Sequence, residues 1–121
     1  MEAFDAATSC TYNTVIGFRA GSAATTVVNQ AVFIGYNAGF TAANSTAPTA
    51  IGSGCMQNAT GTFSVGVGYN AFSQAAGAFA VAIGGNAGYS GGGSYGTHVG
   101  YQAGRNVTGC LLYTSPSPRD H

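Results

Sequence analysis

Few side chains in this sequence are of types that do chemistry, and their spacing does not assemble a catalytic set. The 121 residues include two His, three Cys, three acidic and three basic side chains, and Lys is absent. A hydrolase relay needs a carboxylate near its histidine, yet before residue 110 the only carboxylates are Glu2 and Asp5, far from His98. A P-loop needs a lysine to reach its phosphates. We therefore expect no enzymatic activity, no catalytic residue and no cofactor.

The cysteines and charges exclude further classes of function. The cysteines stand at Cys10, Cys55 and Cys110, an odd number without the spacing of zinc ligands, so neither a disulfide framework nor a metal site is expected. Arg19, Arg105 and Arg119 stand singly and the formal net charge is +0, which predicts no nucleic-acid binding. No run of about 18 apolar residues occurs, which predicts no membrane insertion in this segment.

Composition shows that a conventional core does not organise the chain. The chain has 20 Gly and 21 Ala, whereas Ile, Val, Leu and Phe together occupy only 22 positions. That is too few large apolar residues for an ordinary globular core of this length. Seven Tyr, seven Phe and the zero net charge argue equally against disorder.

A repeat supplies the missing organisation. An aliphatic residue followed by glycine recurs at Ile16-Gly17, Ile34-Gly35, Ile51-Gly52, Val67-Gly68, Ile83-Gly84 and Val99-Gly100, with spacings of 18, 17, 16, 16 and 16 residues. We number each repeat relative to this aliphatic residue, at position 0. Position −4 holds Tyr12, Gln30, Ala47, Phe63, Phe79 and Tyr95, and position +4 holds Ala in every repeat except at Cys55. A fixed period of this kind is typical of solenoids.

Side-chain alternation assigns the residues to two faces. Positions −4, −2 and 0 lie on one face of a strand and carry aromatic, β-branched and aliphatic residues, so we predict that this face is buried. The opposite face is mostly small at position −1, with Val15, Phe33, Ala50, Gly66, Ala82 and His98. We predict that another backbone packs against it. Cys55 replaces a recurrent Ala and is interpreted as a small buried filler.

The predicted fold is all-β, a parallel β-roll or β-solenoid of about six coils of 16–18 residues. One repeat cannot bury its own apolar face, whereas stacked coils pair strand on strand at about 4.8 Å. The array is predicted over residues 13–109, with residues 1–12 as the remnant of a preceding coil. A helical alternative fails because Gly and β-branched residues occupy the periodic positions.

Residues 110–121 differ in composition from the rest of the chain. Leu occurs only at Leu111 and Leu112, and two of the three prolines are Pro116 and Pro118. The segment CLLYTSPSPRD resembles the in-frame translation of an adapter used in transposase-based sequencing libraries. We therefore expect a non-native, adapter-like tail and leave it out of the fold prediction.

The repeat itself resembles a known family. The segments NTVIGFRAG, VFIGYNAG, AVAIGGNAG and THVGYQAG, within residues 13–105, are similar to the head repeats of trimeric autotransporter adhesins (YadA-like) and to repeats of phage tail fibres. The resemblance implies a left-handed roll, a homotrimer, and a location outside the cell, on a cell surface or a virion. It also implies binding to a host surface or glycan receptor. The repeat is longer than that of the adhesins, which favours the tail-fibre interpretation.

The thinness of such a roll gives a separate reason for assembly, since each chain buries little area alone. We predict that three chains pack through the small-residue face. Tyr36, Tyr69 and Tyr101 follow the glycine and are candidates for binding a host glycan or surface; the alternative is that they pack over the corners.

Two other functions stay open. IGYNAG also fits the hexapeptide pattern of left-handed β-helix acyltransferases, in which His98 would serve as the base. An ice-binding solenoid needs a flat, regular threonine array, whereas Thr14, Thr49 and Thr97 alternate with valines. In a trimer, three copies of His98 on the small-residue face could also converge on an ion.

Overall fold

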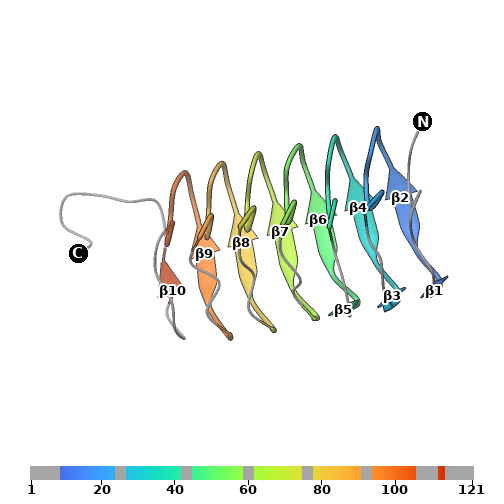
Figure 1. Ribbon diagram of the computed structural model, residues 1–121. Helices are drawn as coiled ribbons and strands as arrows, with labels where there is room; N and C mark the ends of the chain where they lie inside the picture. The colour runs from blue at the N-terminus through green and yellow to red at the C-terminus, as the bar shows by residue number, and fades with distance from the viewer. Residues whose placement is uncertain are drawn as a thin grey trace.

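The computed structural model describes residues 9–23, 27–41, 45–58, 62–74, 78–90 and 94–105, and the strand at 112–113. It confirms an all-β fold in which parallel strands stack as a β-solenoid (Figure 1). The larger sheet contains β2 (Thr14–Ile16), β4 (Val32–Ile34), β6 (Thr49–Ile51), β7 (Val65–Val67), β8 (Val81–Ile83), β9 (Thr97–Val99) and β10 (Leu112–Tyr113). The smaller sheet contains β1 (Ser9–Thr11), β3 (Val27–Asn29) and β5 (Ser45–Thr46).

The strands pair in the register of the repeat. Ile16 lies beside Ile34, Ile34 beside Ile51, and the pairing continues through Val67 and Ile83 to Val99. Each following glycine donates its N–H to the carbonyl oxygen of the aliphatic residue one repeat earlier, at 2.7–2.8 Å. The aliphatic residues therefore form one straight column along the solenoid. β10, which pairs with β9, falls within the adapter-like segment.

The structure requires glycine at position +1 for two separate reasons, its backbone conformation and the space around it. Its φ lies between +120° and +132° in all six repeats, a region that essentially only glycine adopts. A Cβ on Gly68 would also lie 2.6 Å from the carbonyl oxygen of Gly84. The sharp bend and the close approach of successive backbones therefore depend on the same missing side chain.

Asparagine recurs at position +3 because that residue is left-handed. Asn37, Asn70 and Asn86 have φ values of 57° to 58°, and Arg19 and Gln102 adopt the same conformation at 59–60°. Asn tolerates this region better than most residues. Two residues with positive φ, the glycine at position +1 and the residue at position +3, thus turn the chain away from the sheet.

The prediction of which face is buried was wrong. The small-residue face points into the solenoid: Phe33, Ala50, Ala82 and His98 are fully buried, whereas the aliphatic column points outward. The physical reason is the narrow interior. A Cβ on Gly39 would lie 2.6 Å from the ring of Phe33, so one coil has no room for two large inward side chains.

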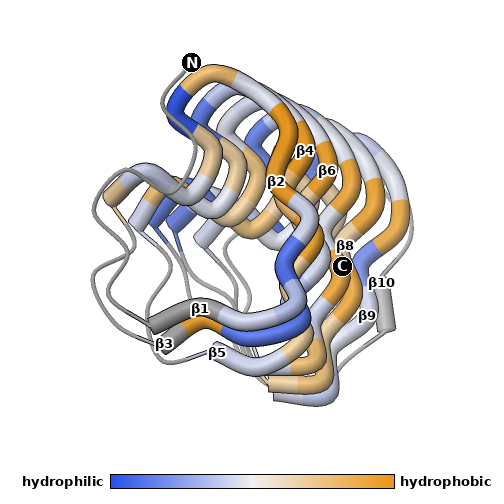
Figure 2. Tube along the Cα trace, turned by 90° about the vertical axis from the view of Figure 1, so that its right-hand side faces the viewer, coloured by the Kyte–Doolittle hydropathy of each residue, from blue (hydrophilic) through white to orange (hydrophobic). Residues whose placement is uncertain are grey.

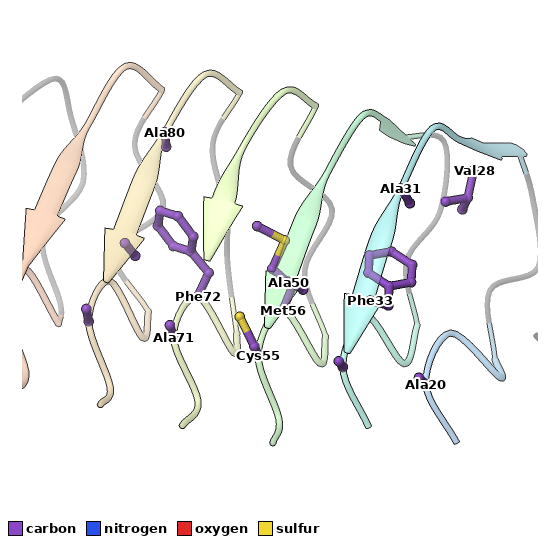
Figure 3. Packing of buried hydrophobic residues seen from close by; sticks show 13 residues of the cluster. Ala20, Val28, Ala31, Phe33, Ala50, Cys55, Met56, Ala71, Phe72 and Ala80 are labelled. Atoms are coloured by element: carbon purple, nitrogen blue, oxygen red, sulfur yellow. The ribbon is translucent and has the colours of Figure 1, made fainter. Parts of the chain in front are cut away.

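A coil that holds a large inward side chain takes it from one of two positions of the repeat, −1 or +5. In the second repeat it is Phe33, from β4 at position −1, with glycine at position +5. In the third and fourth repeats it is Met56 and Phe72, both at position +5, and position −1 of these repeats holds Ala50 and Gly66. Figure 3 shows Phe33, Met56 and Phe72 among the alanines of the interior. All position +5 residues have φ between +51° and +60°. A large residue at one position therefore accompanies a small residue at the other.

Candidate interaction surface

The exposed large hydrophobic residues of the described chain lie at three positions of the repeat only. Position −4 contributes Tyr12, Phe63, Phe79 and Tyr95; position 0 contributes Ile16, Ile51, Ile83 and Val99; position +2 contributes Phe18, Tyr36, Tyr69 and Tyr101. We call these twelve residues the apolar belt. Figure 2 shows hydrophobic residues of successive strands following one another along the axis as a continuous stripe. The belt runs the length of the described solenoid on the outward side of the larger sheet.

Aromatic rings form the two sides of the belt, with the aliphatic column between them. Phe79 stacks on Phe63 at 5.3 Å between ring centroids and on Tyr95 at 5.4 Å. Phe18 and Tyr36 stack at 5.9 Å and 4° between ring planes. We call the aromatics at position −4 the leading ridge and those at position +2 the trailing ridge. Offset-stacked rings at these separations attract one another, so the leading ridge is a ladder from Phe63 to Tyr95, and the trailing ridge contains one stacked pair, Phe18 and Tyr36.

The backbone holds the leading ridge in place. Phe63, Phe79 and Tyr95 have φ values of 54°, 58° and 63°, which is an uncommon conformation for bulky residues. It is maintained by hydrogen bonds between coils: the N–H of Phe79 donates to the carbonyl of Thr62 at 2.9 Å, and that of Tyr95 donates to Ala78 at 3.0 Å. The outward direction of these rings is therefore set by the corner of the coil.

The three candidate tyrosines are exposed, at 50% for Tyr36 and 61% for both Tyr69 and Tyr101. One face of Tyr36 is covered by Phe18. Tyr101 lies over Gly85, whose Cβ, if present, would be 3.2 Å from the Tyr101 ring. Sequence reasoning found this ridge but missed the leading ridge, because alternation had placed position −4 inside. The signal that could have revealed the leading ridge is the recurrence of aromatics at position −4 in successive repeats, where they stack on one another.

His98 does not lie at an interface between chains, where the sequence pattern had placed it. It is fully buried on the inner wall, edge-to-face against Phe72 with ring centroids 6.2 Å apart. The small-residue face is therefore inside the solenoid, and the prediction that three chains pack through it was wrong. For the same reason, copies of this ring in other chains cannot converge on an ion. Burial also separates the imidazole from any substrate in solution. Within the described ranges, no three His, Cys, Asp or Glu residues gather into a group that could hold a metal ion.

Cys55 is a buried filler, as predicted. Desolvation by burial raises the pKa of its thiol from 9.0 to about 12, opposed by a backbone hydrogen bond from Ile51. The thiol is therefore neutral at physiological pH, and a neutral thiol is a poor nucleophile. This residue shapes the core and has no chemistry of its own.

The belt carries no charge in the described part of the chain. Arg19 lies over the ring of Phe40 at 4.4 Å and Arg105 over that of Tyr89 at 5.3 Å, both outside the three belt positions. Glu2 and Asp5, the two carboxylates that the sequence has before residue 110, lie outside the described residues. An uncharged, aromatic surface on a rigid support is suited to contact with another apolar surface.

Comparison with known proteins adds no relative: no protein-family model, no curated protein and no solved structure matches the chain. The described residues contain no helix long and apolar enough to span a bilayer. The surface must therefore be interpreted from its own geometry.

Proposed function

We propose that the chain is a structural, adhesive segment of a fibre, of the kind found in phage tail fibres and bacterial surface adhesins. In this proposal the coils, about six and left-handed, form one third of a homotrimeric rod outside the cell or on a virion. The rod presents a host-binding structure and catalyses no reaction. The repeat resemblance and the apolar belt support this proposal from independent directions.

The belt is the observation that carries the proposal. Aromatic side chains have about 150–250 Å² of surface each, so the eight belt aromatics, at 50–87% exposure, leave on the order of 900 Å² open. Monomeric proteins rarely expose contiguous apolar patches above a few hundred Å². A stable interface buries about 800 Å² per partner. The open aromatic area is therefore about what one chain brings to one such interface, and it lies on the aliphatic side of the sheet.

The test compares two aspartate substitutions in the same repeat. Ile83→Asp places a carboxylate in the belt, whereas Ser90→Asp places it at an exposed position outside the belt. A buried, unpaired carboxylate costs several kcal/mol, so we expect Ile83→Asp to sediment as a monomer and Ser90→Asp to stay trimeric like the parent chain. Sedimentation of the parent chain as a folded monomer would contradict the proposal.

Ice binding is a second candidate that the exposed sheet favours. Positions −2 and 0 carry only Thr, Val and Ile, in two columns on a regular parallel sheet. Such an array would have to stay open to ice, whereas the trimer covers it. Thermal hysteresis from a monomeric chain, lost on Thr49→Asp substitution, would favour this function over the fibre.

Receptor binding by Tyr36, Tyr69 and Tyr101 requires the trailing ridge to remain open in the assembly, and is therefore an alternative to any assembly in which a neighbouring chain covers this ridge. Glycan-array binding that disappears on Tyr→Ala substitution at these three positions would support it. Binding that survives the substitutions would place the receptor site elsewhere on the rod.

A further inference from the structure

We propose that neighbouring copies in the assembly meet through unlike ridges, the leading ridge of one chain against the trailing ridge of the next. This inference rests on the proposed trimer and adds how its chains touch. The two ridges lie before and after the same strand, so they border opposite sides of the larger sheet. When three sheets face a common axis in the same direction, each sheet meets its neighbour by opposite sides.

The partner that contacts each ridge is a second copy of this chain, because only a molecule with the same rise per coil can match a ridge along its whole length. Positions −4 and +2 recur once per coil and therefore about every 4.8 Å along the axis, and the rings of successive coils in the leading ridge stack at 5.3 and 5.4 Å. A partner that matches a ridge along its length must repeat with the same rise. A copy of the chain in the same orientation does so, and the uncharged belt offers no ionic group to any other partner.

The residues at positions −4 and +2 of one repeat differ in size in a way that this pairing can use. In the third repeat both positions are small, with Ala47 at −4 and Ser53 at +2, so the backbones of neighbouring chains can approach most closely there. In the fifth repeat Phe79 would meet Gly85, which has no side chain. In the fourth repeat Phe63 would meet Tyr69, an aromatic pair of the kind that stabilises interfaces.

The third repeat provides a direct test by disulfide trapping. In the full chain with Cys10→Ser and Cys110→Ser, Ala47→Cys and Ser53→Cys are introduced together. Within one chain the extended strand β6 lies between the two positions and alone spans roughly 10 Å. A disulfide needs Cα atoms about 4.4–6.8 Å apart, so it can form only between chains. We expect mild oxidation to give covalent trimers on non-reducing gels.

The controls separate this arrangement from others. Ala47→Cys alone and Ser53→Cys alone should give no covalent product. Ala47→Cys with Tyr101→Cys should also give none, because these positions are three repeats, or about 14 Å, apart along the axis. Covalent dimers from either single variant would show that like ridges meet, and would overturn the inference.

Two further readouts keep the inference falsifiable. Circular dichroism verifies folding of each variant, and Gln30→Cys with Tyr36→Cys provides a second pair in an adjacent repeat. Trimers by sedimentation with no covalent product from either pair, by oxidation or with a short bismaleimide, would overturn the ridge contact but leave the trimer standing. Monomers from the parent chain would instead contradict the proposed function.

Discussion

At the scale of single residues, the interior follows a rule of one large side chain per filled coil. Phe33 fills its coil from the strand, and Met56 and Phe72 fill theirs from the corner. Position +5 has φ between +51° and +60° whether it holds glycine, Met or Phe, so the backbone accepts either choice. The sequence showed a mixture of Phe, Ala and Gly at position −1 without an evident reason. Comparison of positions −1 and +5 within each repeat would have revealed it.

This rule predicts the result of moving a filler. Phe33→Ala should lower the free energy of unfolding by about 3–5 kcal/mol, because it leaves a cavity. Adding Gly39→Met reproduces the Ala50 and Met56 arrangement of the next repeat and should restore part of that loss. Gly39→Met alone should destabilise, since its Cβ would meet the Phe33 ring. Urea unfolding measures all three; a double variant no more stable than Phe33→Ala would refute the rule.

The buried thiol predicts a dependence on pH. Because burial raises the pKa of Cys55 from 9.0 to about 12, its contribution to stability is complete below about pH 9 and is lost as pH rises toward 12. In the Cys10→Ser, Cys110→Ser background, disulfide reagents at pH 8 should react slowly with the folded chain and rapidly in denaturant. Fast reaction of the folded chain would show that the thiol is accessible.

At the scale of the strand and its corner, the sequence predicts much of the structure. The aliphatic-glycine spacing gave the parallel pairing and the register, because the bend needs a residue without a side chain. It could not give the buried face. Alternation says which residues share a side of the sheet, but which side is inside depends on how closely the returning chain approaches, as at Gly39 and Phe33. The aromatic rings at position −4, which the prediction had assigned to the core, therefore lie outside it.

Two alanine substitutions test the corner. Gly68→Ala should destabilise the chain by at least about 2 kcal/mol, because φ is +132° and the new Cβ would meet the Gly84 backbone at 2.6 Å. Gly85→Ala is the matched control, since its Cβ would meet only the Tyr101 side chain, at 3.2 Å. Thermal unfolding should show a large effect for the first and a small one for the second. Equal effects would contradict the proposed role of the corner glycine.

At the scale of the whole molecule, the solenoid is assembled from units that contact only their neighbours. Its stability is then close to a sum of terms for each repeat and each interface between repeats. The register of β7 on β8, with Val67 beside Ile83, depends on a spacing of one full period. Spacings of 16 to 18 residues all keep this register, so small changes between strands are accommodated, whereas we expect the loss of half a period to break it.

Deletion variants test this unit. Removal of residues 69–84 takes out one period of 16 residues and should leave a folded, shorter solenoid with a similar circular dichroism spectrum and a somewhat lower Tm. Removal of residues 69–76 takes out half a period, destroys the register after Gly68 and should abolish cooperative unfolding. If both deletions fold equally well, the repeat is not the structural unit.

The bonds that join one coil to the next also decide how a rod of this kind responds to traction. Strands are linked by hydrogen bonds directed along the axis, so force applied to the two ends of a single chain loads the outermost coil first. That coil detaches as a whole and releases 16–18 residues, or roughly 55–60 Å of extended chain, before the next coil bears the load. An isolated chain would thus lengthen in equal increments, whereas lateral neighbours gripping the same coils would have to yield together.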